Sequence, residues 1–90
     1  MCWTKKTLSI INELGIHARP AAMMVHQISE LNCDITITKD GETVNGKSIM
    51  GVLMLAAECG SEIEVAAKGP DSEKAIDVIE NLIKSKFNED

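Results

Sequence analysis

The segment Gly15-Ile16-His17-Ala18-Arg19-Pro20-Ala21 holds the residues of this sequence best suited to chemistry. Pro20 has no amide hydrogen and a φ that is already helical, so it favours a helix that begins close to His17. The first amides of that helix and its positive dipole end would favour an anion such as a phosphoryl group beside the imidazole. A neutral imidazole nitrogen is a nucleophile, and the Arg19 guanidinium can pair with phosphate oxygens. We therefore predict that His17 is itself phosphorylated.

Segments of strand period and helix period alternate along the chain and would position this histidine. Alternating apolar residues predict strands at residues 7–12, 33–38, 42–44 and 62–68, and Asp40-Gly41 predicts a two-residue hairpin turn. Apolar residues at helical spacing predict helices at residues 18–30, at residues 49–55 behind a Ser48 cap, and after Gly69-Pro70-Asp71-Ser72. On the first helix, Met23 falls off the apolar stripe. Met54 is assigned to the core.

This order, βαββαβα, predicts the fold class. Each strand has one apolar face, and amphipathic helices can cover a sheet on that face while the other face stays in water. We expect an α+β fold, an open-faced β-sandwich in which three helices cover one side of a four-stranded antiparallel sheet. The 90 residues suit a single domain, residues 1–90.

Composition excludes several classes of function. The net charge is −5, no basic block is present, and Trp3 and Phe87 are the only aromatic residues, which argues against nucleic-acid binding. The apolar runs are too short to cross a bilayer, and the first six residues lack the hydrophobic stretch of a signal peptide. We expect a cytosolic protein that does not associate with membranes.

The cysteines Cys2, Cys33 and Cys59 are odd in number and widely spaced, so we interpret them as unpaired thiols. No set of four converging ligands can be assembled, and no metal ion or cofactor is expected. His26, nine residues beyond His17, is expected to be a surface residue. Acidic residues are scattered, and no carboxylate pair is placed for acid–base catalysis, so an independent small enzyme is poorly supported.

The segment Gly15 to Ala21 resembles the active-site motif of the histidine-containing phosphocarrier proteins (HPr) of the phosphoenolpyruvate-dependent phosphotransferase system. A second segment, Lys47-Ser48-Ile49-Met50-Gly51-Val52-Leu53, resembles the regulatory serine of that family and the short helix behind it. The spacing between His17 and Ser48, the element order and the chain length agree with the same family.

The resemblance implies a stoichiometric phosphoryl carrier rather than an enzyme. It implies that His17 accepts phosphate on Nδ1 from enzyme I and passes it to enzyme IIA domains, with Arg19 steadying the phosphoryl group. In many bacteria the family serine that matches Ser48 is phosphorylated with ATP by a dedicated kinase, so the resemblance implies a regulatory role for Ser48, although serine is also a preferred helix cap for structural reasons alone. Met23, Ile49 and Met50 match positions that contact partners. We expect a monomer.

Two branches of the family remain open. The lead-in Asn12-Glu13-Leu14-Gly15 and the tail Phe87-Asn88-Glu89-Asp90 resemble the nitrogen-related carriers (NPr), whereas the segment around Ser48 resembles carriers from species with the serine kinase. The alternative to sugar uptake is therefore a regulatory phosphocarrier that acts by docking to other proteins according to its phosphorylation state.

Overall fold

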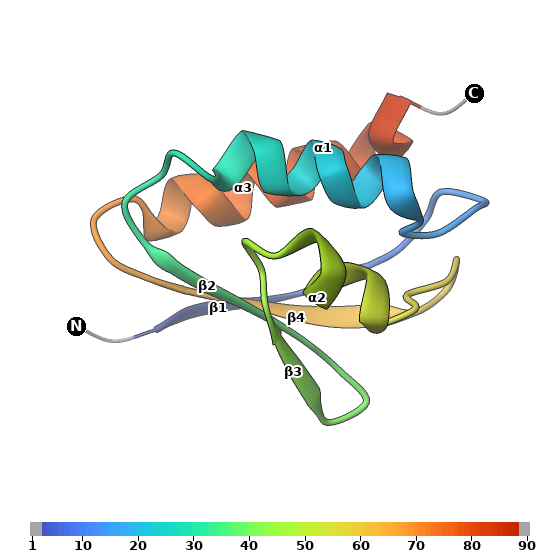
Figure 1. Ribbon diagram of the computed structural model, residues 1–90, viewed down its shortest axis with the longest axis horizontal. Coiled ribbons are helices and arrows are strands. Elements are labelled where there is room, and N and C mark those ends of the chain that lie inside the picture. The colour runs from blue at the N-terminus through green and yellow to red at the C-terminus, as the bar shows by residue number, and fades with distance from the viewer. Residues whose placement is uncertain (1–2, 89–90) are drawn as a thin grey trace.

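The computed structural model describes residues 3–88 and has the predicted order of strands and helices (Figure 1). The strands are β1 (Thr4–Ser9), β2 (Asp34–Lys39), β3 (Glu42–Asn45) and β4 (Glu62–Lys68). The helices are α1 (Ala18–Ile28), α2 (Ile49–Met54) and α3 (Ser72–Lys84), and a single turn, η1 (Lys86–Asn88), follows α3. Within residues 3–88, no helix is both long enough and apolar enough to cross a bilayer.

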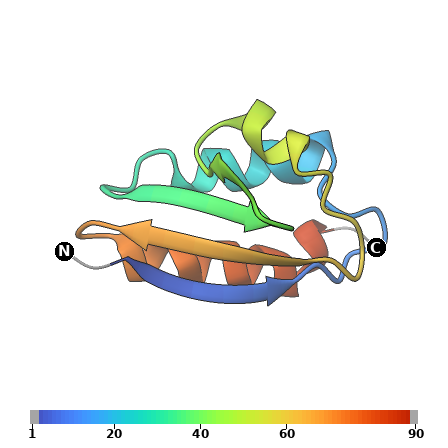
Figure 2. The same ribbon diagram turned by 90° about the horizontal axis from the view of Figure 1, so that it is seen from below.

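The four strands form one antiparallel sheet in the order β1-β4-β2-β3. All three helices lie on the same side of this sheet, and Figure 2 views the strands from the side without helices. Side chains alternate between the two faces, so apolar partners such as Leu8 and Ile63 face the helices while Thr7 and Glu64 face water. The predicted open-faced α+β sandwich is confirmed.

The core lies between the sheet and the helices. Each helix contributes one apolar stripe, as the helical spacing of the sequence predicted. The fully buried side chains at the centre come from both layers and include Met24 and Ile28 of α1, Val52 of α2, Ile79 of α3, Ile37 and Val65 of the sheet, and Phe87 of η1.

The hairpin between β2 and β3 has the turn that the sequence predicted. Asp40 and Gly41 both have positive φ, 51° and 82°, which is the backbone of the two-residue turn that matches the twist of antiparallel strands. At the other sheet edge, Lys6 of β1 pairs with Glu80 of α3 at 2.8 Å. The hydrogen bond from the Lys6 ammonium, followed by its charge, lowers the pKa of the Glu80 carboxyl group.

Three sequence-based expectations need correction. Strand β1 covers residues 4–9 rather than 7–12, because Ile10 already pairs with the loop before β4 through bonds of 2.8 Å to Ser61 and Gly60. Met54 is not in the core but 69% exposed, because it lies about 200° around the helix from the buried Val52. Met23, expected off the buried stripe, is half-buried and packs against the core.

The chain leaves α2 through a left-handed residue, Ala56, whose φ is +51°. Glycine adopts this conformation without the clash of a Cβ atom, so Ala56→Gly should raise the free energy of unfolding by about 0.5–1 kcal/mol. Urea denaturation measures the change. Ala22→Gly, at an exposed position inside α1, is the matched control and should lose about 1 kcal/mol. Equal losses in both variants would contradict strain at Ala56.

Candidate functional site

His17 occupies the N-cap position of α1. Its backbone is extended, with φ −100° and ψ −166°, and its carbonyl accepts the first helical hydrogen bond from the amide of Ala21 at 3.0 Å. The imidazole makes no capping hydrogen bond to the helix. The amides of Ala18 and Arg19 have no carbonyl one turn back to bond, and Pro20 has no amide hydrogen. The half-buried His17 and the exposed Arg19 therefore share the positive end of α1, as the sequence predicted.

A tight contact fixes the loop in front of His17. Gly15 has φ +68°, and a Cβ atom there would lie 2.5 Å from the carbonyl oxygen of Ala57 and 2.8 Å from Cα of Glu58. The next residue, Ile16, donates its amide to the same Ala57 oxygen at 2.8 Å. Only glycine fits this close approach of two backbones, which explains the glycine two residues before the histidine.

Ser48 caps α2, as predicted. Its Oγ accepts a hydrogen bond from the amide of Gly51 at 3.1 Å. The preceding Lys47 donates from Nζ to the carbonyl of Leu31, just beyond the C-terminal end of α1, at 2.7 Å. At the other end, Ala57 follows the C-terminus of α2 and accepts a hydrogen bond from Ile16, which precedes α1. The two helices therefore run in opposite directions (Figure 1). His17 and Ser48 thus lie at opposite ends of the α1–α2 pair, and the fold does not bring them together.

The capping hydrogen bond of Ser48 is expected to stabilise the protein. Ser48→Ala removes the acceptor for the Gly51 amide and should lower the free energy of unfolding by about 1 kcal/mol, measured by urea denaturation. Ser48→Asp is the matched control, because a carboxylate also caps and favours a helix N-terminus, and it should retain most of the stability. A serine-to-alanine change without any loss would show that the cap does not contribute.

Large apolar side chains are exposed on the two segments beside the Ile16–Ala57 contact. Ile49, Met50 and Met54 of α2 are exposed by 42%, 68% and 69%, and Ile11 and Leu14 precede His17 with 45% and 68%. Ile49 and Met50 were predicted, whereas Ile11, Leu14 and Met54 were missed. The signal for Leu14 was present in the sequence, because it is an apolar residue in an otherwise polar turn.

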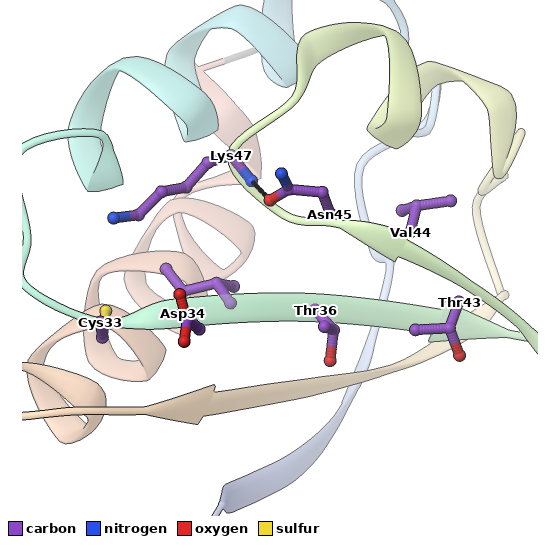
Figure 3. A pocket seen from close by; sticks show the side chains of 8 residues that line it. Cys33, Asp34, Thr36, Thr43, Val44, Asn45 and Lys47 are labelled. Atoms are coloured by element: carbon purple, nitrogen blue, oxygen red, sulfur yellow. Dashed lines mark hydrogen bonds between the residues drawn. The ribbon is translucent and has the colours of Figure 1, made fainter.

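A surface hollow of about 430 Å³ lies beside β2 and β3, away from His17, and Cys33, Thr43 and Lys47 are among the residues that line it (Figure 3). Burial raises the pKa of the Cys33 thiol against the opposing charge of Lys47. Cys33 and the exposed Cys59 are both unpaired, as expected, and Cys2 lies outside the described residues. In the described part of the chain, no three His, Cys, Asp or Glu side chains converge as metal ligands.

Residues 4–85 match the protein family described as "PTS HPr component phosphorylation site". Over 85 residues the chain is 46% identical to the phosphocarrier protein HPr of Treponema pallidum (strain Nichols), an alignment that covers 94% of this chain and 97% of that one. The chain belongs to the HPr family. As a member it is a phosphocarrier protein of the phosphotransferase system and not a catalytic enzyme.

Solved HPr structures have the same fold. The crystal structure of HPr-C-His from Thermoanaerobacter tengcongensis superposes with a TM-score of 0.92 at 41% identity, covering 97% of this chain and 98% of that one. An HPr dimer from the same organism gives a TM-score of 0.76 at 43% identity and covers 91% and 94% of the two chains. Solved HPr proteins thus include a dimer, although the sequence led us to expect a monomer here.

Proposed function

We propose that His17 accepts a phosphoryl group on Nδ1 from enzyme I, with phosphoenolpyruvate as the source, and passes it to enzyme IIA domains for sugar uptake. In each transfer the bond from phosphorus to Nδ1 forms as the bond to the donor breaks, and discharge reverses this exchange. The proposal depends on one observation above the rest, the place of His17 at the N-cap of α1 with Arg19 in the first turn.

The arrangement suits a group that must be loaded and released. The amides of the first turn and the Arg19 guanidinium stabilise negative charge on the phosphoryl oxygens, which favours loading. The site lies at a helix mouth where Arg19 is exposed, so a partner can supply the remaining charge stabilisation and in-line alignment. A phosphorus–nitrogen bond is labile, which keeps the group transferable.

Incubation with enzyme I and phosphoenolpyruvate tests this function. The intact mass should rise by one phosphoryl group, and acid treatment should remove it, because phosphohistidine is acid-labile. Omission of enzyme I is the control and should leave the mass unchanged. An unmodified mass, or a phosphate that resists acid, would contradict the proposed carrier site.

The second phosphorylation site in our proposal is Ser48, modified by a serine kinase with ATP. A phosphate of about −2 charge at the N-terminus of α2 should be tolerated locally. Because Ser48 lies at the far end of the α1–α2 pair, it would act by covering Ile49 and Met50 and by repelling an acidic partner surface. Ser48→Asp should therefore raise the KM of enzyme I for this carrier, whereas Ser48→Ala should leave that KM unchanged.

Partners would dock on the exposed side chains of α2, for which Ile49 and Met50 are better placed than the half-buried Met23. Such a surface serves sugar uptake and also the alternative role in phosphorylation-dependent docking of the nitrogen-related branch. Complementation of sugar uptake in a strain without its own carrier separates the two. We expect the carrier to act as a monomer, and light scattering in solution tests this against the dimeric relative.

A further inference from the structure

Asn12 is a buried polar residue in the loop that leads to His17. The residue has 0% of its surface exposed, and among the described residues no other polar or charged residue is buried. A polar group is costly to bury unless it is hydrogen-bonded, so its presence calls for a specific contact.

That contact closes the turn in front of the histidine. Asn12 Nδ2 donates to the carbonyl oxygen of Gly15 at 2.6 Å, and the Gly15 amide donates back to the carbonyl of Asn12 at 3.1 Å. The acceptor is a backbone carbonyl, so the donor must be the amide nitrogen of the side chain and not its oxygen. One residue thus holds both the N–H and the C=O of Gly15.

The same loop is tied to the neighbouring segment on both sides of this turn. Before the turn, Ile10 exchanges hydrogen bonds of 2.8 Å with Ser61 and Gly60. After it, Ile16 bonds to Ala57 at 2.8 Å, and Gly15 lies too close to Ala57 for any side chain. The turn from Asn12 to Gly15 is therefore the part of the loop whose shape decides where His17 meets α1.

We infer that Asn12 is a positioning residue for phosphoryl transfer, acting through Gly15 on His17. This inference rests on the proposed function of His17. Asn12 is fully buried, so its effect is on the geometry of the reacting imidazole and not on docking. Small misplacements of a reacting group are costly, because transfer requires in-line alignment.

Asn12→Asp is the sharpest variant, because it keeps the shape of the side chain but replaces the donating amide by a carboxylate oxygen. With enzyme I and phosphoenolpyruvate, we expect the maximal rate of His17 phosphorylation to fall by about tenfold or more while KM changes less than about twofold. Asn12→Ser is the second variant and carries a hydroxyl donor on a shorter side chain. Its maximal rate of phosphorylation should lie between the rates of the wild-type protein and Asn12→Asp.

Ile79→Val is the matched control, because it weakens the core within α3, remote from this loop. It should keep the wild-type rate wherever it is folded, and all rates are compared at temperatures at which urea denaturation shows the variants folded. An unchanged maximal rate in folded Asn12→Asp, or an equal loss in Ile79→Val, would overturn the inference.

Hydrogen exchange on the wild-type protein supplies a test that needs neither a stable variant nor phosphorylation. The Gly15 and Ile16 amides should exchange far more slowly than the exposed amides of the β2–β3 turn. Exchange at the rate of an open loop would overturn the positioning role. If enzyme I leaves the wild-type protein unlabelled, the proposed function fails, and the exchange data still decide whether the loop is held.

Discussion

Replacing His17 with alanine is expected to abolish acid-labile phosphorylation by enzyme I and leave the fold intact. The imidazole of His17 supplies the nucleophilic nitrogen at the N-terminus of α1, and alanine has no nucleophilic group. The ring is only half-buried and lies outside the core, so the free energy of unfolding should change by less than about 1 kcal/mol. Intact mass before and after acid treatment, together with urea denaturation, measures both results.

The chain contains a matched control for this change. His26 lies on the same helix, is exposed, and belongs to the last turn of α1, away from the positive end. His26→Ala should be phosphorylated at the wild-type rate. Labelling that survives in His17→Ala, or that disappears in His26→Ala, would remove His17 from the role that we propose.

Phe87→Ala is expected to have the largest effect on stability. The ring is fully buried, although it follows the last helix in a turn where Lys86, Phe87 and Asn88 all have left-handed backbones, with φ of 55°, 53° and 61°. Removing a buried phenylalanine costs about 3–5 kcal/mol. We expect about 3 kcal/mol, at the lower end, because the turn can then relax from its unfavourable conformation. The melting temperature should fall by more than about 10 °C.

Two variants control for this prediction. Phe87→Leu keeps most of the buried apolar volume and should cost less than about 1.5 kcal/mol. Met54→Ala removes a large apolar side chain that is 69% exposed and should change stability by less than about 0.5 kcal/mol. A small loss in Phe87→Ala, comparable to that of Met54→Ala, would show that η1 does not hold the core closed.

Periodicity predicted the strands best where apolar residues face the helices and polar residues face water. Strand β4 has its predicted bounds, 62–68, because Ile63 and Val65 alternate with the polar Glu62 and Glu64, and the small Ala66 is the one departure from this pattern. Strand β1 was displaced because Lys6 lies on the helix side, where its ammonium reaches Glu80 and leaves no apolar signal. Local pattern therefore fails where a long polar side chain substitutes for an apolar one.

Contacts between distant segments could not be predicted from local pattern. Asn12 and Phe87 are fully buried, yet nothing in their neighbourhood in the sequence distinguishes them from exposed loop and tail residues. Asp71 does occupy the predicted cap position of α3, but its carboxylate accepts from the amide of Asn32 at 2.8 Å and does not cap the helix.

The candidate site likewise has features that local sequence predicted and features that depend on tertiary packing. Gly15 and Pro20 predicted His17 at the start of a helix because both act on the backbone locally. The cap at Ser48 was predicted for the same reason, and it is confirmed. The separation of Ser48 from His17 depends on the opposite directions of α1 and α2, which follow from tertiary packing and have no signature in either motif.

The sheet order also has a consequence for the chain as it leaves the ribosome. Strand β4 separates β1 from β2, yet it is the last strand to be synthesised. The β2–β3 hairpin can form early from neighbouring residues, whereas β1 has no partner until residue 68 has emerged. The sheet therefore cannot be completed before β4 is made, and nascent chains that stop before β4 expose an unpaired strand to aggregation or to chaperones.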